Sequence, residues 1–306
     1  MPRPYDHFLY AMPSQDHDVD SDEEIPSPMF QELPRLAFIP VKNLVVHETH
    51  DAWRTLPLIR RIQSSGVFRN PPIVTPLPDS TGRYMVLDGA NRTAALKELG
   101  APHALVQITQ PDDPGLNLLN WNHVIWEMDS TRLVEGMGSI PGTELVPVED
   151  PGTQPGLMDA RGPVIVQLPD DIAYIVLTPQ RNVFERVGLL NAIVDSYRDN
   201  ARFDRTTAQN IKPLKQIYPQ LGGLVIFPHF NISDLLMLAG RGCLLPTGIT
   251  RFVISPRVLH LNYPLEELAA DKPLSIKNQE LRRWIQDRLA HKHVRYYAES
   301  TFLFDE

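Results

Sequence analysis

The stretch from Tyr84 to Gly100 reads YMVLDGANRTAALKELG, and it decides the fold. Its first residues, up to Asp88, form an apolar run typical of a buried strand, and the residues that follow Gly89 are mostly strong helix formers. Because Gly89 lets the backbone turn sharply and approach a ligand, this order predicts a strand, a tight turn and a helix. Asp88 is therefore expected at the carboxyl end of a strand, where open α/β sheets bind their ligands.

The start of that predicted helix suits an anion. The free N–H groups of its first turn favour negative charge, and Arg92 adds a planar charged fork that fits a phosphate group. We therefore expect a nucleotide phosphate to be bound by five consecutive residues: Gly89, Ala90, Asn91, Arg92 and Thr93. From the pattern alone, the same turn could equally be an ordinary tight connection with a solvated Arg92.

Around this stretch, short apolar runs alternate with helical ones. The runs LAFIPV, LVV, PPIVTPL, RYMVLD and ALVQI indicate strands, and PLIRRIQSS indicates a further helix. This alternation with short links predicts a compact sheet flanked by helices. We assign residues 35–135 to this first domain, and we expect its last part, from Leu116 to Glu135, to be helical or bridging.

The chain changes character at residue 136. Gly and Pro are dense over residues 136–163, which predicts a linker or loop without regular elements. Residues 164–306 are expected to form a second α/β domain that contributes to the substrate site. Its predicted elements include the strands RFVIS and VLHLNY, expected as a pair joined through Pro256, and the helix SIKNQELRRWIQDRLAHK.

Charge and composition limit the possible functions. Residues 1–34 carry eight acidic side chains against the single base Arg3, and so hold −7 of the formal net charge of −8. This composition predicts a mobile acidic tail, and the nearly neutral remainder gives no support to nucleic-acid binding. The single cysteine, Cys243, cannot form an intrachain disulfide. Since the start lacks a signal-peptide pattern and no 18-residue apolar run occurs, we expect a soluble, cytoplasmic protein that does not contact a membrane.

A second carboxylate occurs where His47 and Glu48 follow the run LVV. Glu48 stands where a loop at a strand end could face the same pocket as Asp88, and a carboxylate there can accept a proton from a hydroxyl nucleophile. The alternative is a surface glutamate. His47 could orient Glu48 or contact phosphate, although neighbouring residues on a strand point in opposite directions.

Together these motifs resemble a known family. The blocks HETHDAWR, FRNPPIVTPL, GRYMVLDGANRTAALKELG and LLPTGITRFVIS are similar, in order and spacing, to the free L-serine kinases, including archaeal and siderophore-pathway members. The resemblance implies an α/β (α+β) protein with a ParB/sulfiredoxin-like N-terminal domain, a second mixed α/β domain and an active site in the cleft between them. Sulfiredoxin chemistry itself is excluded, because the comparable turn carries a cysteine there and Ala90-Asn91 here.

The resemblance implies a kinase that uses ATP or ADP with Mg²⁺ to convert free L-serine to O-phospho-L-serine. Glu48 would be the general base, Asp88 would organise Mg²⁺ or the reacting phosphate, and His47 would join the phosphate-binding residues. Substrate contacts would be made by Arg54, Trp121, His123, Thr250 and Arg251. Of these, Arg251 would pair with the serine carboxylate. Asn91 departs from the pattern, since many relatives carry a histidine there.

A different class of function is a ParB-like, nucleotide-dependent DNA-binding or transcriptional regulator. The nearly neutral charge outside the tail and the absence of an evident helix-turn-helix pattern count against it. The sequence leaves open the oligomeric state and the choice between ATP and ADP as phosphoryl donor.

Overall fold

The computed structural model describes residues 33–49, 52–149, 162–178 and 182–297. The described residues from Pro34 onward belong to one compact unit, and they are mixed α/β, as predicted. Nearly all of the predicted acidic tail lies outside the described residues. The predicted domain boundaries stay predictions. Within the described residues, no helix combines the length and the apolar character that a membrane crossing requires.

The first sheet has five strands and contains the Asp88 turn. In space the order is β1-β6-β4-β5-β2, in which β2 is parallel to β5 and β4 is antiparallel to β5. The turn forms as predicted, because β5 ends at Asp88 and α2 begins at Ala90. The elements are β1 (Arg35–Pro40), β2 (Leu44–Val46), β4 (Ile73–Pro76), β5 (Tyr84–Asp88) and β6 (His103–Ile108), with α1 (Ala52–Ser65), α2 (Ala90–Glu98) and the short 3₁₀ helix η2 (Val41–Asn43).

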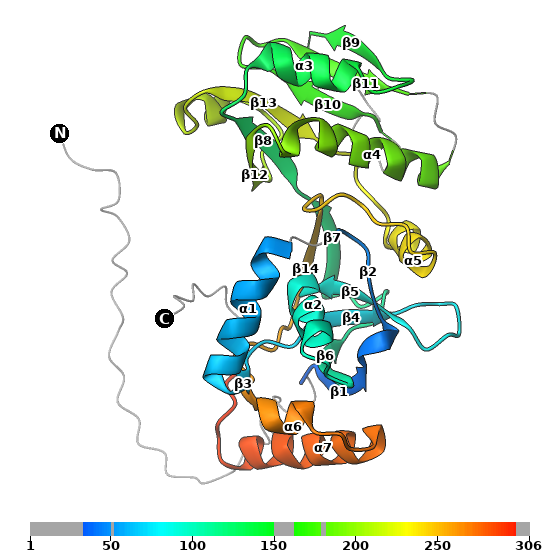
Figure 1. The fold of residues 1–306 in the computed structure, drawn as a ribbon, viewed down its shortest axis with the longest axis vertical. Coiled ribbons are helices and arrows are strands. Elements are labelled where there is room, and N and C mark those ends of the chain that lie inside the picture. The colour runs from blue at the N-terminus through cyan, green and yellow to red at the C-terminus, as the bar shows by residue number, and fades with distance from the viewer. Residues whose placement is uncertain (1–32, 50–51, 150–161, 179–181, 298–306) are drawn as a thin grey trace, which may run out of the picture. The chain divides into compact units, whose positions relative to one another are not determined.

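The last described helices return to this first sheet. β15 (Tyr263–Pro264) pairs with β3 (Val67–Phe68), and α6 (Leu265–Ala269) and α7 (Leu274–Ala290) follow it near β1 (Figure 1). On α7, the amide of Asn278 bonds both backbone groups of Phe38, at 2.8 and 3.1 Å. Leu281 of the same helix is buried with Phe38 in one hydrophobic cluster. The C-terminal helix therefore completes the core of the N-terminal sheet.

The second sheet has six strands, all antiparallel to their neighbours, in the order β12-β8-β13-β10-β11-β9. Its strands are β8 (Asn122–Trp126), β9 (Glu144–Val148), β10 (Val164–Gln167), β11 (Ala173–Leu177), β12 (Arg202–Thr206) and β13 (Leu221–Ile226). The helices that accompany it are α3 (Ser130–Gly138), α4 (Val183–Arg198) and the 3₁₀ helix η4 (Lys212–Gln216), whereas α5 (Ile232–Gly240) contacts β2 and β5 of the first sheet.

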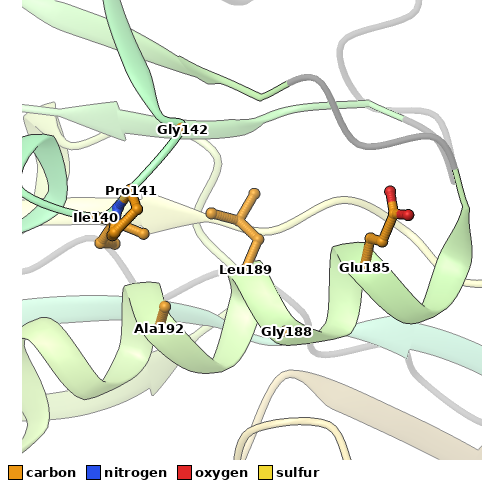
Figure 2. Close-up of a pocket in the computed structure, with 7 residues that line it drawn as sticks. All are labelled: Ile140, Pro141, Gly142, Glu185, Gly188, Leu189 and Ala192. Atoms are coloured by element: carbon orange, nitrogen blue, oxygen red, sulfur yellow. The ribbon is translucent and has the colours of Figure 1, made fainter.

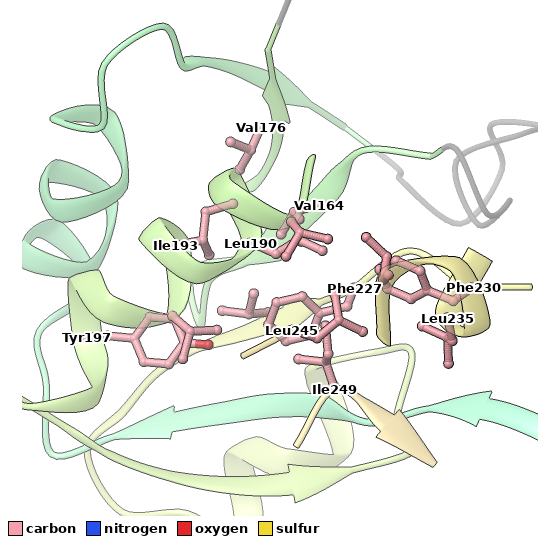
Figure 3. Packing of buried hydrophobic residues seen from close by; sticks show 14 of the residues in the cluster. Val164, Val176, Leu190, Ile193, Tyr197, Phe227, Phe230, Leu235, Leu245 and Ile249 are labelled. Atoms are coloured by element: carbon pink, nitrogen blue, oxygen red, sulfur yellow. The ribbon is translucent and has the colours of Figure 1, made fainter. Parts of the chain in front are cut away.

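The core of this part forms between α4 and the sheet. Asn182 caps α4, since its side chain accepts hydrogen bonds from the N–H groups of Phe184 and Glu185. Figure 3 shows side chains of α4, such as Leu190 and Ile193, gathered with Val164 and Val176 of the strands. Burial of an aliphatic side chain of this size contributes about 1.5–3 kcal/mol, so this cluster is a main source of stability.

A separate strand pair carries Thr250 and Arg251, two of the residues predicted to contact the substrate. β7 (Leu116–Asn120) pairs antiparallel with β14 (Thr250–Ile254), which sets Thr250 opposite Asn120. The backbone N–H of Trp121 then bonds the carbonyl of Ile249 over 3.0 Å. Motifs more than a hundred residues apart in sequence are thereby placed side by side.

Three expectations about local structure were wrong. The stretch from Leu116 to Glu135 is β7, β8 and the start of α3, because periodicity does not separate short buried strands from helices. Residues 136–163 contain the end of α3 and all of β9, whose Pro147 is tolerated because β9 lies at the sheet edge. RFVIS and VLHLNY do not pair with each other, since β14 pairs with β7 and only Tyr263, the last residue of the second run, lies in a strand, β15.

Candidate active site

Glu48 is held by the segment that leads into β14. Its Oε2 accepts a hydrogen bond from the N–H of Gly248 at 2.8 Å, and its Oε1 accepts one from the N–H of Thr250 at 2.7 Å. The hydroxyl of Thr250 also donates to Oε1. The Glu48 side chain is only 14% exposed, so it is not the surface glutamate of the alternative reading. These donors fix the orientation of the Glu48 carboxylate.

The backbone on both sides of Glu48 is tied to the same segment. Glu48 forms a parallel β-bridge with Leu245, and the N–H of Leu245 bonds the carbonyl of His47 at 2.8 Å. The N–H of Thr49 bonds the carbonyl of Leu245 at 3.0 Å, and the hydroxyls of Thr49 and Thr247 lie 2.8 Å apart. The position of Glu48 is therefore set by backbone pairing as well as by its own side chain.

His123 contacts the segment that holds Glu48 from the protein interior. It is fully buried, and its Nε2 lies 3.1 Å from the carbonyl oxygen of Gly248, so Nε2–H is the donor. Its Nδ1 lies 2.6 Å from the hydroxyl of Tyr197, which donates to it. Burial lowers the pKa of His123 from 6.5 to about 4, which keeps the imidazole neutral, as this pattern needs. His123 does not line the cavity described below, so the structure places it behind the site and not at a substrate.

Asp88 and Arg92 form the second part of the site. Gly89 has φ +96°, and a Cβ there would lie 2.9 Å from Nε of Arg92 and 3.1 Å from Cα of Pro72, so only glycine fits the turn. One turn into α2, Arg92 donates to Oδ2 of Asp88 at 3.0 Å. Burial lowers the pKa of the Arg92 guanidinium, and Asp88 opposes that shift. Arg257 also pairs with Oδ2 of Asp88.

Glu48 and Asp88 line one cavity of about 1350 Å³. The residues predicted from sequence that reach its wall are His47, Glu48, Asp88, Gly89, Ala90, Asn91, Arg92, Trp121, Thr250 and Arg251. Six arginines and three carboxylates line the cavity, which makes it basic overall. An excess of guanidinium groups at the start of a helix suits an anion with several charges, such as a polyphosphate.

Some predicted residues have special positions in this wall. The guanidinium of Arg251 lies over the Trp121 ring, 4.7 Å from its centroid, so the two side chains form one unit. Asn91 Oδ1 is buried at the cavity without a hydrogen-bond partner in the described part of the chain. Thr93 is buried behind the wall and its hydroxyl is likewise unpaired among the described residues. Arg54 lies in the first turn of α1, but its side chain is outside the described residues.

Sequence reasoning missed four arginines and a tryptophan of the cavity wall: Arg198, Arg202, Arg205, Arg257 and Trp126. Arg257 lies just beyond the block LLPTGITRFVIS. Arg198, Arg202 and Arg205 lie within the eight residues from 198 to 205, whose net positive charge of one was visible in the sequence. Trp126 carries Arg202 over its ring at 5.2 Å, and its Nε1 is buried without a partner among the described residues. That N–H is available to an acceptor on a ligand.

A second cavity, of about 420 Å³, lies between the end of α3 and α4 (Figure 2). Its wall is formed by Ile140, Pro141, Gly142, Glu185, Gly188, Leu189 and Ala192. Glu185 is the one ionisable residue in this wall. The cavity with Glu48 and Asp88 is therefore the candidate active site.

Asp88 also fits a role in binding Mg²⁺. The described residues contain no group of three or more His, Cys, Asp or Glu side chains that could enclose a metal ion. Mg²⁺ at phosphoryl-transfer sites is usually bound by one or two carboxylates together with substrate phosphates and waters. One carboxylate at the mouth of the sheet is enough for that arrangement, and both ion pairs of Asp88 use Oδ2 and not Oδ1.

Comparison with known proteins gives three strong similarities, while no family model matches the chain. The ATP-dependent L-serine kinase SbnI of Staphylococcus aureus (strain NCTC 8325 / PS 47) is 26% identical over 284 residues, which cover 89% of this chain and 97% of the relative. The solved structure of SbnI with a C-terminal truncation, from Staphylococcus aureus, has a TM-score of 0.65 and 25% identity, and the match covers 85% of this chain and 97% of that one. The predicted resemblance to the free L-serine kinases is confirmed.

A second solved structure supports the fold. A free serine kinase in complex with AMP has a TM-score of 0.63 at 18% identity, and the match covers 81% of this chain and 98% of the solved one. The matches cover almost the whole length of the relatives, so the similarity to the free L-serine kinases includes both sheets. The predicted fold class, a mixed α/β protein with the ParB/sulfiredoxin-like fold, is confirmed.

Proposed function

We propose that this chain is a kinase that phosphorylates the hydroxyl of free L-serine with an adenine nucleotide. The observation that carries the proposal is that Glu48 and Asp88, forty residues apart, line one basic cavity, with Asp88 at the opening of α2. A relative similar over 89% of the chain is named as an ATP-dependent L-serine kinase. The two carboxylates supply the two roles that the reaction needs, a base for the acceptor and an anchor for the charged donor.

The donor phosphates are assigned to the Asp88 end of the cavity. The first N–H groups of α2, the guanidinium of Arg92 and that of Arg257 converge there around Asp88. Phosphoryl transfer passes through a loose transition state, so catalysis depends on positioning and on offsetting charge. Two guanidinium groups fixed by one carboxylate are oriented in advance for this task.

Mg²⁺ would be held at Asp88 and would supply charge neutralisation on the donor phosphates. The ion pairs with Arg92 and Arg257 hold the Asp88 carboxylate in one orientation. These arginines then hold the phosphate oxygens that the ion does not contact.

The acceptor is assigned to the Glu48 end. L-Serine has a carboxylate, an ammonium group and a hydroxyl, and Arg251 offers a planar fork for the carboxylate. Trp121 lies under that fork and limits its movement. Glu48 then takes the proton of the serine hydroxyl as the serine oxygen attacks the terminal phosphorus and the bond to the departing nucleotide breaks.

The donor proposed first is ATP, because the relative that matches over 284 residues is named as ATP-dependent. ADP remains a donor to be tested. The free serine kinase with AMP shows that a protein of this fold accommodates an adenosine monophosphate. In this chain the N–H of Trp126 and Oδ1 of Asn91, which have no partner among the described residues, are candidates to contact such a nucleotide.

The test is direct product analysis. Purified protein is mixed with L-serine, Mg²⁺ and either ATP or ADP, and phosphorus NMR follows the formation of a phosphomonoester. L-Threonine, L-homoserine and glycerate serve as competing acceptors. We expect O-phospho-L-serine, and little product from glycerate, which lacks the ammonium group. Duplex DNA that binds with a steep dependence on salt, in the absence of any product, would instead favour the regulator.

A further inference from the structure

His47 makes two hydrogen bonds that fix its protonation. It directly follows β2 and is 6% exposed. Its Nδ1 lies 2.8 Å from the carbonyl oxygen of Val86, and its Nε2 lies 2.8 Å from the hydroxyl oxygen of Thr250. A carbonyl oxygen only accepts, so Nδ1 carries a hydrogen. Both ring nitrogens are engaged, which leaves none for the phosphate contact predicted from the sequence.

The hydroxyl of Thr250 has two partners and one hydrogen. It lies 2.8 Å from Nε2 of His47, and it donates to Oε1 of Glu48. If its hydrogen points to Glu48, the contact with His47 requires a second hydrogen on Nε2. Val86, His47, Thr250 and Glu48 form a series of hydrogen bonds. Every contact in this series has a donor only if the series holds one proton more than a neutral His47 and an ionised Glu48 provide.

That additional proton can reside on His47 or on Glu48. On Glu48 it would make a carboxylic acid, and Thr250 would then donate to Nε2. The backbone N–H groups of Gly248 and Thr250, at 2.8 and 2.7 Å, favour the ionised carboxylate instead. The additional proton is therefore assigned to His47, whose Nε2 lies 4.0 Å from Oε1 of Glu48.

We propose that His47 is a positioning residue of the active site: as an imidazolium bridged by Thr250, it holds Glu48 ionised and in its reactive orientation. This deepens the proposed function and rests on it. The ring is fixed from its other side by an edge-on contact with Phe252, at 5.4 Å between ring centroids. The other charged residues on the contacting strands are Asp88, at the end of β5, and Arg251 on β14.

The same accounting identifies which oxygen of Glu48 reacts. A carboxylate offers about four acceptor positions. The N–H and O–H of Thr250 use two on Oε1, and the N–H of Gly248 uses one on Oε2. The remaining position is on Oε2, and it is the one assigned to the serine hydroxyl. In the transfer, the serine O–H bond breaks, an O–H bond forms at Oε2, and His47 keeps both of its ring protons.

The direct test is the protonation of His47 in the whole protein. Nitrogen NMR of the ¹⁵N-histidine-labelled chain distinguishes an imidazolium from a neutral ring, and the signal that disappears in His47→Gln identifies the residue. We expect two protonated ring nitrogens in the wild type and in Thr250→Ser at neutral pH, and a neutral ring in Thr250→Val and Glu48→Gln. A neutral His47 in the wild type would overturn the proposal.

Kinetics provide the second readout through a matched pair of variants. His47→Gln keeps a donor that can reach Thr250, whereas the shorter side chain of His47→Asn can reach only Val86. We expect kcat to fall by about 10-fold in the first and by about 100-fold in the second, with the nucleotide KM unchanged in both. Equal losses in the two variants would contradict the bridge. A wild type that makes no phosphoserine but retains the imidazolium would refute the proposed function and leave the protonation assignment standing.

Discussion

Thr250 donates its backbone N–H to Oε1 of Glu48 over 2.7 Å, although the two residues are 202 positions apart in the sequence. This bond joins two of the four blocks that carry the family resemblance, HETHDAWR around Glu48 and LLPTGITRFVIS around Arg251. The proposed general base is thus oriented by the same strand, β14, that carries the proposed carboxylate-binding residue. Under the proposed function, placement of the acceptor and activation of its hydroxyl would both depend on this strand.

The glycine next to this bond is predicted to matter for both stability and rate. Gly248 has φ +80°, and a Cβ there would lie 2.3 Å from Nε of Arg205. Gly248→Ala should lower the free energy of unfolding by about 1–2 kcal/mol through its backbone conformation, and should lower kcat by about 10-fold because the N–H bonded to Glu48 moves. Chemical denaturation and steady-state kinetics measure the two effects.

Gly242→Ala is the matched control. Gly242 has φ +67°, but a Cβ there meets no atom within 4 Å. This variant should show a similar loss of stability with kcat unchanged. An equal loss of kcat in both variants would show that the effect comes from general destabilisation.

Arg257 is predicted to act on the nucleotide. It forms the second ion pair of Asp88, and no sequence motif identified it. Arg257→Gln should raise the nucleotide KM by about 10-fold, the loss expected for one charge-assisted contact, and should leave the serine KM nearly unchanged. The exposed Arg283 on α7 gives the control Arg283→Gln. A larger effect on serine than on nucleotide would place Arg257 at the other end of the cavity.

Arg251 is predicted to bind the serine carboxylate. Arg251→Ala should raise the serine KM by about 10- to 100-fold, with a much smaller change for the nucleotide. Arg251→Lys should recover only part of the affinity, since an ammonium group lacks the planar fork. Asn117→Ala, at an exposed position of the paired strand β7 outside the cavity wall, tests for effects of strand perturbation. An unchanged serine KM in Arg251→Ala would remove this assignment.

His123 is predicted to make the protein sensitive to acid. Burial lowers its pKa from 6.5 to about 4, so the folded state binds fewer protons than the unfolded state between those values. Its contribution to stability is complete above about pH 6.5 and is lost as the pH falls toward 4, by about 3 kcal/mol in total. The difference in unfolding free energy between the wild type and His123→Gln should shrink by that amount from pH 7 to pH 4.

Denaturant titrations at several pH values measure this difference. His293→Gln, which changes an exposed histidine, should leave the pH profile of the wild type unchanged. Parallel profiles for the wild type and His123→Gln would show that His123 does not titrate in this range.

Much of the first sheet could be predicted from the sequence because its signals are local. The apolar run before Asp88, the glycine and the helix-forming run after it each indicate their own structure, and the structure has that order. Asp88 therefore lies at the end of the strand and Arg92 in the first turn of the helix, as the sequence predicted. The same local reasoning failed for Leu116 to Glu135, where the conformation depends on the pairing of β7 with β14 and on the burial of β8 in the second sheet.

The rest of the site depends on contacts that no local pattern contains. His47 and Glu48 both reach Thr250, although adjacent strand residues point in opposite directions, because β2 ends at Val46 and the chain bends at His47. His123 was predicted at the substrate but supports Gly248 from the interior. Such positions follow from contacts between segments 125 to 203 residues apart, which the spacing of motifs cannot show.

The central claim is that Glu48 is the base in a transfer of phosphate to L-serine. Its most direct test compares the wild type with Glu48→Gln in a single turnover, with Mg²⁺, L-serine and γ-labelled ATP. The glutamine keeps the size of the side chain and one oxygen acceptor but cannot take the proton. We predict that the wild type forms O-phospho-L-serine, and that Glu48→Gln binds ATP with the same Kd but forms the product at least about 100-fold more slowly. Phosphoserine formed at the wild-type rate by Glu48→Gln would contradict the account.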